Sequence, residues 1–153
     1  MDQLSHLDDE GRARMVDVGG KRPQRRLARA RGSIALRPET REKIEQQLVR
    51  KGDVLCVAQV AGIQAAKRTA ELIPLCHPLP LEKVDLRLAV DEVGVTATGE
   101  VACTGRTGVE MEALVAVSVA LLTVYDMCKA VDTEMRIGPI ELVEKVKRDV
   151  ADV

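Results

Sequence analysis

Apolar residues alternate with charged ones along part of the chain in the way that a strand with one wet face requires. Residues 82–90 place Val84, Leu86 and Leu88 in such alternation, and residues 94–103 resume an extended pattern after a short turn. A period of two on both sides of a turn predicts a β-hairpin with one wet face on each strand. Two further strands are predicted over residues 25–36 and residues 136–146.

Three segments carry helix signals instead. Residues 38–49 begin with a proline and early acids and place Ile44 and Leu48 four residues apart, which predicts a short amphipathic helix. Residues 53–73 are rich in alanine, with Asp53 as a candidate N-cap and a basic pair late in the segment, and predict one long helix that ends before a proline. Residues 108–131 form the longest apolar segment and are expected to be helical because of their length.

With the short helix over residues 38–49 set aside, the predicted order is β-α-β-β-α-β. This order is the split βαβ arrangement of ferredoxin-like folds, an α+β class in which two long helices lie on one face of an antiparallel sheet. We expect residues 1–20, which are polar, to form a flexible N-terminal arm and residues 21–153 to form a single ferredoxin-like catalytic domain.

The apolar segment 108–131 has a further implication. Thirteen residues between Glu112 and Asp126 carry no charge. A helix that rests on a sheet is expected to be wet on its outer side, so the outer side of this helix is predicted to contact another subunit. Because the two carboxylates are separated by about 21 Å along the axis, a small site that uses both would combine Glu112 of one chain with Asp126 of a neighbour.

Composition narrows the function classes. The chain has 153 residues, of which 46% are hydrophobic, enough for the core of one domain. A net charge of −1 gives no field that would recruit nucleic acid or a membrane surface, and Tyr125 is the only aromatic residue, which disfavours binding by base stacking. The polar N-terminus and the lack of an uncharged apolar run of about 18 residues favour a cytoplasmic protein.

The four cysteines are widely spaced in apolar surroundings. This spacing favours reduced thiols over a disulfide framework. No metal site is expected, because no C-x-x-C motif occurs and the side chains of Cys76 and His77 would point apart in an extended segment.

The segment LIPLCHPLPL contains the only histidine beyond the first six residues, between three prolines. Proline fixes its own φ and restricts the preceding residue, so this segment is expected to be stiff and non-helical. His77 is therefore held firmly, and either a structural or a chemical role fits it.

Several charged residues have two interpretations. Asp126 and Lys129 are three residues apart, which suits either a solvated ion pair or, at a subunit interface, an adjacent acid and base. Lys51 suits an ordinary surface lysine, and Arg26 belongs to a basic run that suits a solvated strand edge.

Near the start of the segment 108–131, the spacing of Thr107 and Glu110 matches a capping box, which favours a helix-start role for Glu110. The backbone amides of Thr107 and Gly108 also suit an anion.

Two long motifs carry a resemblance to a known family. KGDVLCVAQVAGIQAAKRTAELIPLCHPLPL and TGRTGVEMEALVAVSVALLTVYDMCKAVD closely resemble the molybdenum cofactor biosynthesis protein C family, and the similarity extends from Arg14 to the segment IGPI. The resemblance implies a ferredoxin-like subunit in a homo-oligomer, a hexamer built as a trimer of dimers, with active sites at subunit interfaces.

The implied activity is that of a lyase in molybdopterin biosynthesis, a cyclic pyranopterin monophosphate synthase. It converts the 3′,8-cyclised dihydro-GTP triphosphate into cyclic pyranopterin monophosphate and diphosphate without a redox cofactor, and whether Mg²⁺ accompanies the triphosphate is left open. By resemblance the catalytic residues are Asp126, Lys129, Lys51 and His77, and the substrate-binding residues are Leu75, Cys76, His77, Met111, Glu112, Arg26 and Lys67.

The sequence departs from the family pattern over residues 19–31, which are more basic than expected, so the arginine that contacts phosphate is not fixed. Two alternatives stay open: a nucleotide-sensing module that binds a triphosphate without chemistry, and an RNA-binding sheet, which the missing aromatic residues disfavour.

Overall fold

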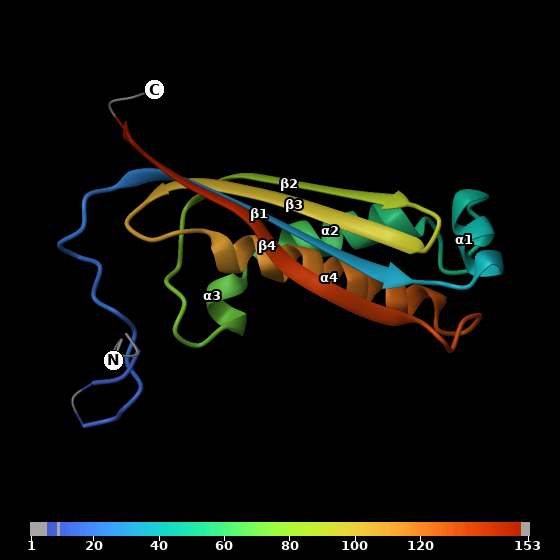
Figure 1. Cartoon of the computed structure of the whole chain (residues 1–153), viewed down its shortest axis with the longest axis horizontal. Coiled ribbons are helices and arrows are strands. Elements are labelled where there is room, and N and C mark those ends of the chain that lie inside the picture. The colour runs from blue at the N-terminus through green and yellow to red at the C-terminus, as the bar shows by residue number, and fades with distance from the viewer. Residues whose placement is uncertain (1–5, 9, 151–153) are drawn as a thin grey trace.

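The fold is built around one four-stranded antiparallel sheet. It is seen in a computed structural model that describes residues 6–8 and 10–150. The strands are β1 (Gln24–Ala35), β2 (Leu81–Val90), β3 (Gly94–Gly105) and β4 (Arg136–Asp149), in the spatial order β2-β3-β1-β4 (Figure 1). The predicted α+β class and the hairpin are confirmed. The ends of each strand differ from the predicted ends by at most three residues.

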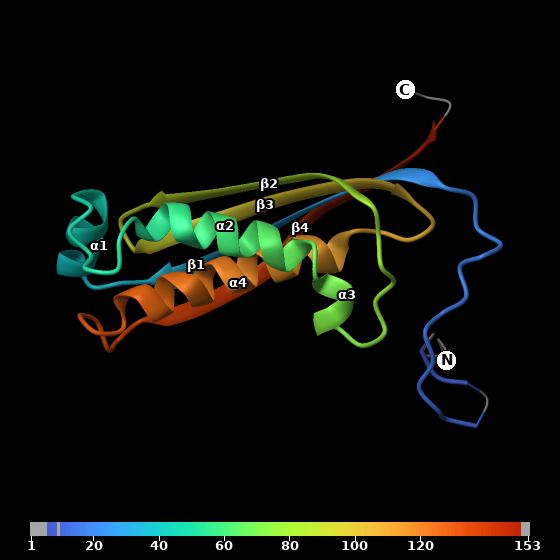
Figure 2. The ribbon, with the colours of Figure 1, turned by 180° about the vertical axis from the view of Figure 1, so that it is seen from behind.

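Four helices occur in the described part of the chain: α1 (Pro38–Glu45), α2 (Val54–Ala66), α3 (Thr69–Leu72) and α4 (Glu110–Cys128). The two long ones, α2 and α4, lie side by side across one face of the sheet, with α4 over β1, β3 and β4 and α2 over β2 (Figure 2). They run antiparallel, so the end of α4 lies near α1 and its start lies near α3.

Small side chains let the two long helices approach closely. A Cβ atom added at Gly62 of α2 would lie 2.3 Å from Leu86 Cδ2 and 2.6 Å from the carbonyl oxygen of Ala116 in α4. Ala113 and Ala120 of α4 are fully buried beside this contact. Close packing of alanine, valine and leucine therefore builds a core without aromatic residues.

The helix starts follow two of the sequence signals. Pro38 occupies the first turn of α1, and the side chain of Asp53 caps α2 by accepting a hydrogen bond of 3.0 Å from the amide of Cys56. The predicted extension of α1 to residue 49 is wrong. The chain leaves the helix after Glu45 and reaches a positive φ of 54° at Gln47.

The prediction of one continuous helix over residues 53–73 is also wrong. The hydroxyl of Thr69 lies 3.0 Å from the carbonyl of Ala66 and 3.4 Å from that of Ala65, and so bonds the last carbonyls of α2. Arg68 has φ −113° and ψ 13°, outside the helical region. A side chain that satisfies the end of α2 lets the chain turn, and α3 starts afresh at Thr69.

The predicted capping box of Thr107 and Glu110 is wrong. Helix α4 begins at Glu110, with Val109 in the N-cap position and no side-chain cap hydrogen bond. Val109 is fully buried, so packing of this residue rather than a polar cap fixes the helix start. The helix ends at Cys128, three residues before the predicted end.

Helix α4 is the one helix in the described residues that is long and apolar enough to cross a membrane by length and composition. Its apolar character is largely explained by packing, since Val117, Leu121 and Val124 are fully buried against the sheet and α2. Leu122 and Tyr125 nevertheless face outward, with Leu122 57% exposed. That another subunit covers this outer side stays a prediction.

The predicted N-terminal arm is only partly described, because residues 1–5 and 9 lie outside the described residues. The rest contains an antiparallel bridge between Leu7 and Ala13, and Asp8 accepts two hydrogen bonds from Arg12 in the turn between them.

Candidate active site

The predicted site residues gather at the two opposite ends of α4. At its C-terminal end, Asp126 lies between two lysines. Lys51, from the loop between α1 and α2, places Nζ 2.8 Å from Asp126 Oδ2 and 2.7 Å from the Asp126 carbonyl oxygen. Lys129 places Nζ 2.7 Å from Asp126 Oδ1. The structure therefore holds a three-residue cluster at this position rather than the isolated i,i+3 pair that the spacing alone indicated.

The two ammonium groups determine the protonation of this cluster. Hydrogen bonds from Lys129 and Lys51 lower the pKa of Asp126 to about 2, and Asp126 in turn raises the pKa of Lys129. All three side chains are about half exposed and can be reached by a substrate. At neutral pH the cluster therefore holds an ionised carboxylate and a lysine that stays protonated.

The second group of predicted residues lines a hollow of about 390 Å³ at the N-terminal end of α4. It includes every residue that was predicted to bind substrate through the PLCH and VEME motifs: Leu75, Cys76, His77, Met111 and Glu112. The other walls come from the loop before α4 and from the N-terminal segment, and are formed by Thr107, Gly108, Glu110, Leu79, His6, Val16, Val18 and Lys21.

The stiff segment predicted around His77 is present. Residues 73–80 contain neither helix nor strand, as expected from their three prolines. His77 Nε2 lies 2.7 Å from the carbonyl oxygen of Val16, so the N-terminal segment helps to orient the imidazole ring.

Glu112 is the buried carboxyl group of this hollow, with only 4% of its surface exposed. Burial, together with the nearby Glu110, raises the pKa of Glu112. Burial and the charge of Glu112 likewise raise the pKa of Cys76, and raise the pKa of Cys103 to about 11. These thiols stay protonated at neutral pH and are poor nucleophiles.

Arg26 lines an adjoining hollow of about 280 Å³ with Lys145 and Lys147 of β4. The Nε atom of Arg26 is buried and has no hydrogen-bond partner among the described residues. Glu110 and Gly108 border both hollows, and Lys145 Nζ lies 3.6 Å from Glu110 Oε1. Two lysines beside an arginine whose buried Nε has no partner among the described residues suit an anionic group such as a phosphate.

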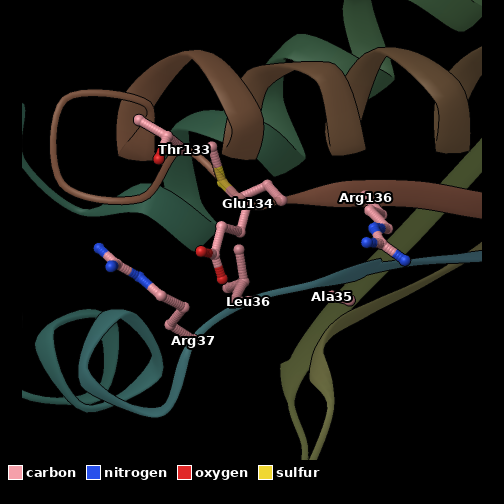
Figure 3. Close-up of a pocket in the computed structure, with 7 residues that line it drawn as sticks. Ala35, Leu36, Arg37, Thr133, Glu134 and Arg136 are labelled. Carbon is pink, nitrogen blue, oxygen red and sulfur yellow. The ribbon is translucent and has the colours of Figure 1, made fainter.

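Lys67 is the exception among the predicted residues. It is the exposed C-cap of α2 and does not line either hollow. Another hollow, of about 740 Å³, lies at the other end of the sheet between residues 35–37 and 133–136, and the predicted site residues do not border it (Figure 3).

Sequence reasoning missed several lining residues. Glu110 was interpreted as part of a helix cap, although it lies only two residues before Glu112, which was predicted to bind substrate. Lys145 and Lys147 are alternate residues of a strand and therefore share one face, a signal that the basic run near Arg26 obscured. Lys21 belongs to the same basic run as Arg26, but its position at the hollow around His77 depends on the fold of the N-terminal segment.

Comparison with known proteins shows the family of the chain. The MoaC family model matches residues 15–147. A protein from Brevibacillus brevis is 57% identical over 145 residues, covering 94% of this chain and 91% of the relative. Proteins from Thermomicrobium roseum and a Roseiflexus species are 58% and 57% identical over 147 residues, covering 95% of this chain and 89% and 93% of the relatives. Each of the three is named cyclic pyranopterin monophosphate synthase. The chain belongs to the MoaC family.

Proposed function

We propose that this chain is a cyclic pyranopterin monophosphate synthase, a lyase of molybdenum cofactor biosynthesis. In this reaction the 3′,8-cyclised dihydro-GTP triphosphate rearranges to cyclic pyranopterin monophosphate and releases diphosphate. The observation that carries the proposal is the Lys51–Asp126–Lys129 cluster, which is formed by the KGD and YDMCK motifs. The high identity to synthases over nearly the whole chain supports it further.

The charges of the cluster suggest roles for its members. A carboxylate with a pKa near 2 is a weak base, so Asp126 orients and stabilises the two ammonium groups in the free enzyme. Lys51 and Lys129 are suited to donate protons and to contact phosphate oxygens. A phosphate group that draws a lysine away would leave Asp126 a stronger base, so substrate binding itself would prepare the carboxylate for proton transfer.

The other end of α4 supplies the proposed binding surface for the pterin-forming ring and the phosphates. Leu75, Cys76, His77, Met111 and Glu112 surround the ring system, with His77 as a second proton carrier. Arg26 binds phosphate, with Lys67 as a more distant contact. No redox cofactor takes part, and any Mg²⁺ enters with the triphosphate as part of the substrate.

We further propose that one complete site combines both ends of α4 from two chains of a hexamer. Fourteen residues of helix separate Glu112 from Asp126, about 21 Å, which is too far for one small substrate to bridge within a chain. Exposed Leu122 and Tyr125 on the outer side of α4 are the apolar surface that such an assembly would cover.

We assign the subunit to the ferredoxin-like arrangement and the enzyme to the cytoplasm. The antiparallel strand order β2-β3-β1-β4, with α2 joining β1 to β2 and α4 joining β3 to β4, supports the fold assignment.

The test is incubation of the purified protein with the cyclised dihydro-GTP intermediate, with diphosphate and pterin products followed by mass spectrometry. We expect equal amounts of the two products. Asp126→Asn is expected to keep the fold and to lower turnover by about 10²-fold or more, the range of a lost proton-transfer group. Binding of an unaltered intermediate by the wild-type protein would contradict the synthase function and favour a sensing module.

A further inference from the structure

One buried carboxylate near the Lys51–Asp126–Lys129 cluster has no part in the proposed chemistry. Asp132, in the loop after α4, is 0% exposed. Its Oδ2 accepts a hydrogen bond of 2.8 Å from the amide of Arg37, and its Oδ1 accepts one of 3.0 Å from the amide of Glu134. Arg37 Nε lies 3.5 Å from the same carboxylate. A fully buried charge of this kind is kept only where it is paired and hydrogen-bonded.

The partners of Asp132 belong to the start of α1. Arg37 is the N-cap of α1, and the buried Thr40 side chain in the first turn contributes to lowering the pKa of Asp132. The guanidinium of Arg37 donates to the carbonyl of Val131. Figure 3 shows Arg37 and Leu36 beside the loop that carries Thr133 and Glu134. Asp132 therefore fastens the start of α1 to the loop after α4.

From α1, a series of main-chain hydrogen bonds leads to Lys51. The amide of Leu48 donates to the carbonyl of Lys43 at 2.8 Å, and the amide of Gly52 donates to the carbonyl of Val49 at 2.9 Å. Val49 is buried in the core, so the segment is also held by packing. Helix α1 and the loop with Lys51 thus form one short, connected unit.

On the α4 side, Asp132 is tied directly to the last helical turn. The amides of Val131 and Asp132 both donate to the carbonyl of Cys128, at 2.9 and 3.0 Å, and the amide of Lys129 donates to Tyr125 at 2.9 Å. Asp132 and the Lys51–Asp126 ion pair are therefore two separate links between the same two structural units.

We propose that Asp132 is a positioning residue, which sets the place of Lys51 Nζ relative to the Asp126 carboxylate by fastening α1 to the end of α4. Its effect on turnover rests on the proposed synthase function, whereas its effect on the Lys51–Asp126 geometry does not. The two effects are measured separately.

The geometry is measured by zero-length carbodiimide coupling, which joins a lysine to a carboxylate only when they are in contact. In the wild-type protein, peptide mass spectrometry should find an amide between Lys51 and Asp126. In Asp132→Ala the yield of this product should fall severalfold. The Glu110–Lys145 pair, 3.6 Å apart at the other end of the molecule, gives an internal reference whose yield should not change.

Turnover of the cyclised dihydro-GTP intermediate is measured on the same variants. Asp132→Ala should lower kcat by about 10²-fold, the effect of a misplacement of about 1 Å in a catalytic group. Asp132→Asn keeps an oxygen acceptor for one of the two amides and should recover part of both the kcat and the cross-link. It also carries the test if the alanine variant does not fold.

Asp91→Asn is the matched control. The Asp91 carboxylate also accepts from two amides, of Val93 and Gly94, and closes the β2–β3 turn near α1. This variant should lose stability but keep the cross-link and kcat of the wild type. A folded Asp132 variant with a wild-type cross-link yield, or with a lost cross-link and unchanged kcat, would overturn the proposal. Loss of the cross-link in a protein whose wild type does not turn over would leave the positioning role standing and reject the synthase function.

Discussion

At the scale of single residues, the position of Asp126 between Lys51 and Lys129 keeps its carboxylate ionised. Each lysine bonds a different oxygen of the carboxylate, so each stabilises the ionised form independently. Glu112, at the other end of α4, is in the opposite situation, because burial favours its neutral form. Two carboxyl groups with pKa values moved in opposite directions are suited to the separate roles of charge stabiliser and proton donor.

The pKa of Asp126 should report the two lysines separately. Lys129→Ala should raise it more than Lys51→Ala does, because the hydrogen bond from Lys129 makes the larger contribution. Side-chain carboxyl NMR titration measures both values, starting from about 2 in the wild type.

The same shift predicts an acid dependence of stability. A lowered folded-state pKa stabilises the protein above the unfolded-state value near 3.8, and the contribution is lost as the pH falls toward about 2. Asp126→Asn should therefore have a lower Tm than the wild type at pH 6, and the difference in Tm should disappear as the pH falls toward about 2.

The titration of the lysine variants has its own contradicting outcome. An Asp126 pKa that stays near 2 in Lys129→Ala would contradict the ion-pair assignment.

At the scale of elements, the sequence predicts correctly those helix starts that depend only on the local preferences of single residues. Pro38 and Asp53 act within their own turns, so their roles in starting α1 and α2 follow from sequence alone. The break at Arg68 and the uncapped start at Val109 depend on a side-chain bond at Thr69 and on burial of Val109, which no local pattern reveals.

The site shows the same division between local and tertiary information. The motifs around Asp126 and His77 were identified by resemblance, and the carboxylate–lysine pair at Asp126 and Lys129 by spacing. The contact of Lys51 with Asp126 spans 75 positions of sequence and arises from the packing of the loop before α2. Lys145 and Lys147 reach the Arg26 hollow only because β4 pairs with β1.

The crossing of α2 and α4 gives a prediction at this scale. Gly62→Ala should destabilise the protein by about 1–3 kcal/mol, because the added methyl group overlaps Leu86 and a main-chain oxygen of α4 and overpacks the core. Urea unfolding measures the change. Gln64→Ala, at an exposed position of the same helix, is the control and should change stability by less than about 0.5 kcal/mol. Equal effects of the two substitutions would show that the helices do not meet at Gly62.

At the scale of the whole molecule, the two ends of α4 pose the question of how one active site is completed. The hollow around Glu112 and His77 contains no residue of the Lys51–Asp126–Lys129 cluster among its described lining. If the site is shared between chains, Glu112→Gln and Asp126→Asn are each inactive alone but complement each other when mixed. If the site lies within one chain, every subunit of the mixture carries a defect and no activity returns.

The expected recovery follows from chance pairing. In a mixture of equal amounts of the two variants, a shared site is intact when one chain supplies Glu112 and its neighbour supplies Asp126, so about one quarter of the wild-type activity should return. The variants must be co-expressed or refolded together, because intact oligomers exchange subunits slowly.

A second mixture separates the two arrangements independently of how much activity returns in the first. Wild-type chains mixed equally with the double variant Glu112→Gln/Asp126→Asn should show about one quarter of the all-wild-type activity if sites are shared, and about one half if each chain holds its own site. An activity of one half in this mixture, together with no recovery in the first mixture, would show that Glu112 and Asp126 of the same chain form one active site. An activity of one quarter in both mixtures would require Glu112 and Asp126 to act together across a subunit interface. The outer side of α4 would then be the first surface to test as that interface.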